Sequence, residues 1–124
     1  MKYKLLQRNN PQDPSQSKWY AAPVSDGKVT RVDVAAEIVN ISSLSRGDVS
    51  NVIECLIDVI PKYLLMGKSV SLGDLGTFRL SFSSDGVDNP AEMTVARIHG
   101  VRVLFVPSVN LKKTLDQIHF EKSE

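Results

Sequence analysis

The sequence predicts one α+β domain, in which two helices precede a β-hairpin sheet and a short helix closes the chain. Apolar residues recur at helical spacing over residues 30–66, and two strand-like runs then flank a glycine turn in residues 70–80. The 124 residues are 42% hydrophobic and 23% charged, which suits a single folded domain. We expect residues 28–120 to form this domain, with residues 1–27 as an N-terminal extension and residues 121–124 as a loose tail.

The N-terminal extension is predicted to contain β-strands. Residues 2–8 and 18–24 are strand-like, and the polar segment between them contains two prolines, so we expect it to be a loop without a regular element. We expect Trp19 and Tyr20 to pack against other residues rather than to stack on a ligand. The extension is predicted to add an edge to the sheet of the core, with binding of a partner as the alternative.

Two capping boxes predict where the helices begin. In this motif a Ser or Thr side chain and an acid three residues later each accept a hydrogen bond from the other residue's backbone N–H. The two pairs are Thr30 with Asp33 and Ser45 with Asp48. They predict helices over residues 31 to about 41 and 46 to about 66.

The second helix is apolar on more than one side. Ile57, Val59 and Leu65 lie outside its main apolar stripe. A chain of this length has too few other elements to cover such a helix, so a second copy of the chain is the natural cover and we predict a homodimer. Cys55, the only cysteine, excludes an intrachain disulfide and is expected to be a buried thiol of this helix.

A hairpin follows the helices. Residues 68–72 and 77–82 are predicted strands in which Phe78, Leu80 and Phe82 face the core. Arg79 then falls on the opposite face.

A polar stretch, residues 83–100, separates this hairpin from a further strand. In that strand Val101, Val103 and Phe105 share one face, and Arg102 lies on the other. A last helix is predicted to open at Pro107-Ser108.

Three segments resemble the HU/IHF family of bacterial histone-like proteins. Leu72–Phe78 resembles the family's signature turn of Gly-aromatic-Gly-x-Phe character, with Leu75 in the aromatic position. Phe105–Lys112 resembles its closing Phe-x-Pro-x-x-x-Leu-Lys segment, and Leu44–Arg46 the start of its second helix. The resemblance covers roughly residues 28–118, and an HU-related subgroup with an N-terminal extension is the closer match.

The resemblance implies an intertwined homodimer whose two β-arms bind duplex DNA in the minor groove with low sequence specificity. By position, residues 83–100 form the arm, with Asn89 and Pro90 at its tip. The residues expected to contact DNA are basic and lie on the saddle, the arm and their flanks: Arg79, Arg97, Arg102, Lys68, Lys112 and Lys113.

The predicted arm is acidic, which leaves a second hypothesis open. Asp85, Asp88 and Glu92 stand against Arg97 alone, a net charge of −2, and the whole chain carries only +1. Phosphate repels such an arm. The alternative is therefore an HU-fold protein-interaction or scaffold module that has lost DNA wrapping.

Other classes of function have no support in the sequence. His99 and His119 lack neighbours at metal-ligand spacing and are expected to be solvent-facing, and no Gly-Lys-Ser/Thr follows the glycine turn. We expect no enzyme, no catalytic or metal-binding residues, no cofactor and no small-molecule substrate. No apolar run suits a signal peptide or a membrane span, so we expect no membrane partner and a cytoplasmic protein, nucleoid-associated if it binds DNA.

Overall fold

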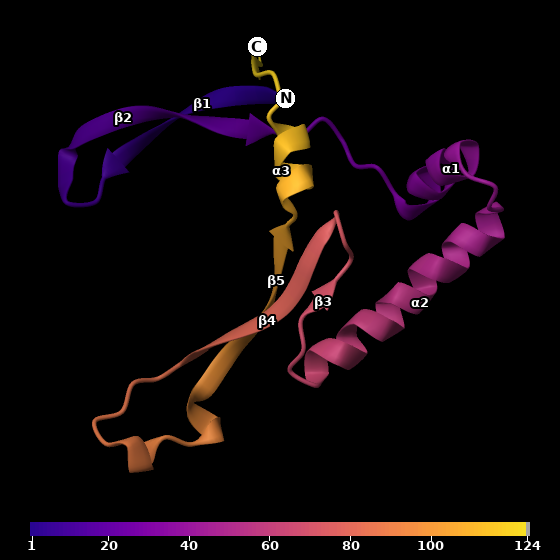
Figure 1. The fold of residues 1–124 in the computed structure, drawn as a ribbon. Helices are drawn as coiled ribbons and strands as arrows, with labels where there is room; N and C mark the ends of the chain where they lie inside the picture. The colour runs from indigo at the N-terminus through magenta and orange to yellow at the C-terminus, as the bar shows by residue number, and fades with distance from the viewer. Residues whose placement is uncertain (124) are drawn as a thin grey trace.

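The computed structural model describes residues 1–123 and has the predicted α+β class and order of elements (Figure 1). Two short 3-10 turns, η1 and η2, interrupt the segment between β4 and β5. The elements are β1 (Lys2–Asn10), β2 (Asp13–Val24), α1 (Arg31–Ile41), α2 (Arg46–Leu65), β3 (Val70–Ser71), β4 (Gly76–Ser84), η1 (Pro90–Glu92), η2 (Val95–Arg97), β5 (Ile98–Pro107), α3 (Val109–Leu115) and β6 (Glu121–Lys122).

Both helices begin at their predicted caps. Each capping box is complete, with the side chain of Thr30 or Ser45 and the acid three residues later bonded to the opposite backbone N–H. α1 packs against α2, and Ala35 and Val49 are buried. The helix boundaries match the prediction to within about one residue.

The main sheet has the order β3-β4-β5, with antiparallel pairing throughout. Phe78 lies opposite Phe105, and their ring centroids are 5.0 Å apart. Phe82 was expected on this same face, but the register shifts between Ser81 and Ser83, and Phe82 is exposed. A β-bulge of this kind interrupts the strict alternation from which its orientation was predicted.

Position 76 in the glycine turn requires glycine for steric reasons. Gly76 has φ of +148°, and a Cβ on it would lie 2.5 Å from the carbonyl oxygen of Val106 and 2.7 Å from Cζ of Phe105. A side chain at this position would therefore collide with β5 at the point where β4 and β5 begin to pair.

The predicted arm is part ribbon and part loop. β4 and β5 pair as far as Ser84 opposite Ile98, and residues 85–97 form a loop that carries η1 and η2. Asn89 caps η1, because its Oδ1 accepts a hydrogen bond of 3.1 Å from the backbone N–H of Ala91, and Pro90 is the first residue of the turn. The predicted tip residues thus lie at the far end of the ribbon.

The extension forms a sheet of its own, so the prediction that it adds an edge to the core sheet is wrong. β1 and β2 make a long antiparallel hairpin that projects away from the helices, and β6 pairs with β1 in parallel (Figure 1). Trp19 is 64% exposed and Tyr20 48%, so the expectation that they are packing residues is also wrong. Within residues 1–123, no other element covers either face of the β1–β2 hairpin beyond its base.

The C-terminal segment holds the base of the hairpin. Residues 121 and 122 form β6 rather than a loose tail, and the backbone N–H of Ser123 donates to the carbonyl oxygen of Tyr3 at 2.8 Å. The Met1 ammonium donates to the carbonyl oxygen of His119 at 2.6 Å. The tail prediction for Glu124 lies outside the described residues.

A single chain buries very little apolar surface. The buried hydrophobic side chains among residues 1–123 are Ala35, Val49 and Leu64. Cys55 is exposed, so the expectation of a buried thiol is wrong for the isolated chain, because no described element of the same chain covers that side of α2.

Candidate nucleic-acid interface

Two of the predicted arginines lie on one face of the β4–β5 ribbon. Arg79 is opposite Leu104 and Arg102 is opposite Ser81, which makes the two arginines diagonal neighbours on the face away from Phe78. The Arg102 guanidinium donates to Ser83 Oγ and to the carbonyl oxygen of Gly100, both at 3.2 Å. These hydrogen bonds hold one cation in place beside the other.

Lys68 joins this pair at the end of α2. A groove between the last turn of α2 and β4 is lined by Lys68, Arg79 and Phe82 together with neighbouring residues. The structure therefore brings together three of the six predicted DNA contacts, Lys68, Arg79 and Arg102, which we call the saddle cluster.

The other three predicted contacts lie at the two ends of β5. Arg97 ends η2, directly before β5, and is partly buried. Lys112 and Lys113 are exposed on α3, which follows β5. Ser108 caps α3, because its Oγ accepts from the backbone N–H of Leu111 at 3.0 Å, and the same hydroxyl donates to the carbonyl oxygen of Asp74 in the glycine turn.

The loop between β4 and β5 keeps its negative charge. Nε2 of His99 lies 3.1 Å from Oδ1 of Asp85, which gives this one carboxylate a partner. Asp88 and Glu92 are exposed and form no ion pair among residues 1–123. The arm therefore presents uncompensated acidic side chains where the resemblance implies a DNA contact.

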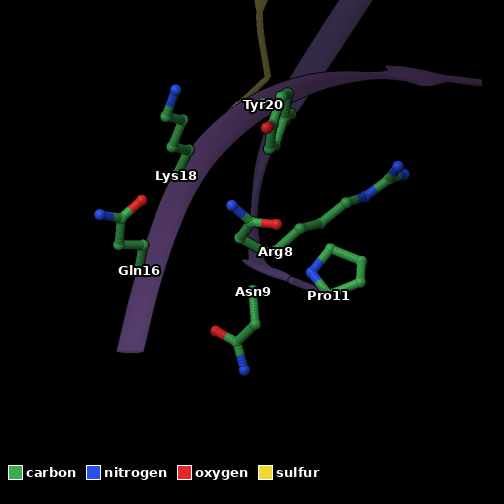
Figure 2. Close-up of a pocket in the computed structure, with 7 residues that line it drawn as sticks. Arg8, Asn9, Pro11, Gln16, Lys18 and Tyr20 are labelled. Carbon is green, nitrogen blue, oxygen red and sulfur yellow. The ribbon is translucent and has the colours of Figure 1, made fainter. Parts of the chain in front are cut away.

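The sequence analysis missed a second group of basic side chains. Arg8 and Lys18 lie opposite each other on the hairpin and line a pocket with Asn10, Gln16 and Tyr20 (Figure 2). The signal was present in the sequence, because Lys2, Lys4 and Arg8 all stand at even positions of a strand. It was overlooked because the pairing partner of each position was unknown.

Residues 1–123 contain no group of three His, Cys, Asp or Glu side chains placed to hold a metal ion. None of their helices is both long enough and apolar enough for a bilayer crossing.

Comparison with known proteins points to the family that the sequence resembles. The family HU-HIG, described as an HU domain fused to wHTH, Ig, or glycine-rich motif, matches residues 1–122. The integration host factor subunit alpha of Maricaulis maris (strain MCS10) is 32% identical over 95 residues, which cover 75% of this chain and 94% of that protein. These matches confirm the resemblance to HU/IHF-type histone-like proteins.

A solved structure shares the fold. It is a candidate DNA-binding protein from Bacteroides vulgatus ATCC 8482, which superimposes with a TM-score of 0.62 at 16% sequence identity. The match covers 98% of this chain, and this chain spans 47% of that protein's length. The extension is therefore included in the shared fold.

Proposed function

The chain belongs to the HU-HIG family of HU-type proteins, and from this premise we propose that it binds duplex DNA with low sequence specificity as a homodimer. The saddle cluster supports this proposal best, because Arg79 and Arg102 share one face of the β4–β5 ribbon and Lys68, which follows α2, lines a groove with Arg79. Arginine and lysine at such positions bind phosphates, which fix a protein on DNA without reading its sequence. The proposed role is architectural and needs no catalysis, and its location is the cytoplasmic nucleoid.

Further basic residues extend the proposed contact beyond the saddle cluster. Arg97, Lys112 and Lys113 flank the saddle as additional phosphate contacts, and Asn89 and Pro90 form the tip of the arm. The backbone at this tip is exposed and ordered by the Asn89 cap. A proline in this setting can wedge between base steps and bend the duplex.

The homodimer is supported by an apolar groove that the single chain leaves open. The groove runs between α2 and the main sheet, and its lining is apolar: Ile53, Leu56, Ile57, Ile60, Pro61, Leu64, Phe78 and Val103. Ile57 and Val103 are 56% and 58% exposed in one chain. A second copy of the same surface covers both grooves at once under two-fold symmetry.

Titration of labelled duplex DNA across a salt series tests the proposal. We expect tight binding at about 50 mM salt and a steep linear fall of log K with log salt, because phosphate binding releases counterions. The combined change Lys68→Gln, Arg79→Gln and Arg102→Gln is expected to make this slope shallower by about 0.9 for each phosphate that is no longer neutralised. Absence of binding by the unmodified protein at about 50 mM salt would contradict the proposal.

The acidic loop favours one alternative, a protein-interaction or scaffold module that has lost DNA wrapping. Its residues 85–97 carry three acids against one arginine. This alternative predicts a dimer that does not bind DNA at any salt concentration, so the same titration distinguishes the two functions.

A further inference from the structure

We propose that the N-terminal hairpin binds the phosphate backbone of duplex DNA through a basic face formed by Lys4, Arg8 and Lys18. This inference rests on the proposed function, since it assigns part of the same DNA-binding activity to the extension. The hairpin would then supply the cations that the loop between β4 and β5 lacks.

The charge of the chain is unevenly distributed. Residues 1–24 contain four basic side chains and one acidic, a net charge of +3. Residues 25–124 contain eleven basic and thirteen acidic side chains, a net charge of −2. The net positive charge of this protein therefore resides on the hairpin, and an approaching polyanion is drawn to the hairpin first.

The strand register places the basic side chains on one face. Arg8 pairs with Lys18, and Lys4 pairs with Ala22 on the same side, since directly opposed residues of an antiparallel pair share a face. Tyr20, opposite Leu6, also lies there. The reverse face carries no charge where residues 3–9 pair with residues 17–23: Tyr3, Leu5, Gln7 and Asn9 from β1, and Ser17, Trp19, Ala21 and Pro23 from β2.

The acidic groups near the hairpin lie at its two ends. Asp13, beside the turn, accepts hydrogen bonds from the backbone N–H and the hydroxyl of Ser15, at 3.2 and 2.6 Å. Glu121 of β6 pairs with Lys2 at the base and faces the same side as that lysine. Lys2 is therefore partly offset, and the three distal cations, Lys4, Arg8 and Lys18, are left to bind an anion.

The distal end of this face has an open pocket that is lined by basic and polar side chains. Arg8, Lys18 and Tyr20 line this pocket with the amides of Asn10 and Gln16, and the Arg8 guanidinium extends away from the Lys18 ammonium (Figure 2). The guanidinium carbon of Arg8 lies 6.0 Å from the centroid of the Tyr20 ring, a cation–π contact that orients the arginine. An arginine fork suits bidentate phosphate binding, and the side-chain amides supply further donors.

The spacing of the cations suits one strand of a duplex. Lys4 lies four residues from Arg8, which is about 13 Å along a β-strand. B-DNA carries one charge per about 3.4 Å of axis on each strand, so the basic face spans about four phosphates. A two-stranded β-ribbon is also narrow enough to enter the major groove.

The test compares two triple variants of the full chain that lose the same charge. One changes Lys4, Arg8 and Lys18 to Gln, and the control changes Lys28, Arg46 and Lys62 to Gln, which lie outside both basic surfaces. We expect the hairpin variant to bind duplex DNA on the order of 100-fold more weakly at about 0.1 M salt, with a slope shallower by about 2.7 for each hairpin engaged. The control should retain most of the affinity and slope, and circular dichroism and light scattering verify that both variants are folded.

A gain-of-charge variant keeps the test decisive if the triple variant does not fold. Asn10→Lys with Gln16→Lys adds two cations to the lining of the same pocket and should steepen the salt slope by about 1.8 for each hairpin engaged. If the unmodified protein binds DNA but both hairpin variants keep its slope, the inference is overturned while the proposed function stands. If the hairpin variants alter binding of single-stranded RNA but not of duplex DNA, the inference is also overturned. If the unmodified protein binds no DNA, the proposed function itself is refuted.

Discussion

Individual carboxylates in the helix caps make the free energy of unfolding of this protein depend on pH. The hydrogen bond from the Ser45 backbone N–H to Asp48, 3.1 Å long, lowers the pKa of that carboxyl, and the Ser45 side chain lowers it further. Thr30 lowers the pKa of Asp33 in the same two ways, with the backbone N–H again the larger cause. In both cases folding favours the charged carboxylate.

The sign of this coupling predicts a loss of stability in acid. A carboxyl whose folded pKa is below its unfolded value, near 3.9, stabilises the fold above that value and ceases to do so as the pH falls through the folded pKa. We expect Asp48→Asn to flatten the decline of the urea midpoint between about pH 5 and pH 2, measured at fixed protein concentration. Asp58→Asn, which lies outside both caps, is the control, and an equal flattening by this variant would contradict the prediction.

Gly76 is the residue that explains the sequence signature of the turn. Its φ of +148° disfavours any side chain, and an added Cβ would contact the backbone of Val106 at 2.5 Å. Gly76→Ala is expected to destabilise the protein by roughly 2–4 kcal/mol, because it combines backbone strain with overpacking.

A second glycine provides the matched control for this change. Gly86 lies in the loop after β4, and a Cβ there would meet no atom within 4 Å. Gly86→Ala should therefore change the free energy of unfolding by no more than about 0.5 kcal/mol. Equal effects of the two alanines in denaturant unfolding would show that the close approach of β5 does not constrain the turn.

At the scale of the elements, the local sequence predicted where helices begin but not which strands pair with each other. The caps at Thr30 and Ser45 determine where α1 and α2 begin, because both partners of each hydrogen bond lie within four residues. Residues 18–24 carried no such information, because their strand propensity does not say which strand they pair with. Hence β2 was identified as a strand, while its place in a separate sheet and the exposure of Trp19 were not.

The same limit applies to the candidate site. Within the saddle cluster, the shared face of Arg79 and Arg102 follows from the alternation of β4 and β5, so these two arginines could be placed together from sequence. The basic face of the hairpin depends on the register of Arg8 opposite Lys18, which only the structure supplies. The bulge at Phe82 shows how one inserted residue defeats strict alternation.

The loop between β4 and β5 should oppose DNA binding rather than support it. Asp88 and Glu92 are exposed, so their charges face any duplex that approaches the ribbon. We expect Asp88→Asn with Glu92→Gln to strengthen DNA binding at about 50 mM salt, with a smaller gain at about 200 mM because salt screens the repulsion. Fluorescence anisotropy with labelled duplex measures both affinities.

The control for the loop variant removes the same charge elsewhere. Asp58→Asn with Asp116→Asn changes the net charge equally but lies on α2 and directly after α3. This pair should alter affinity less than the loop pair does. A weaker affinity for the loop variant would mean that the acidic residues take part in the contact, which would favour the scaffold hypothesis.

At the scale of the whole molecule, the chain exposes more surface than a compact protein of its size. Its accessible area is 10351 Å², whereas a folded monomer of 13.7 kDa has about 6,600 Å². The hairpin and the loop after β4 account for part of this excess. The open groove beside α2 accounts for another part, and an apolar groove of this kind is covered in a stable protein.

The homodimer predicts a mass of twice 13.7 kDa in light scattering at micromolar concentration. Ile57→Asp should abolish this dimer and the cooperative unfolding transition together, because it places a charge in the apolar groove and the single chain has almost no core of its own. Val29→Asp is the matched control, since Val29 is exposed in the linker before α1 and lies outside the groove. A folded monomer of the unmodified chain, or a dimer unaffected by Ile57→Asp, would contradict the two-fold assembly through α2. DNA affinity should fall with the dimer, because two linked sets of cations bind one duplex far more tightly than one set does.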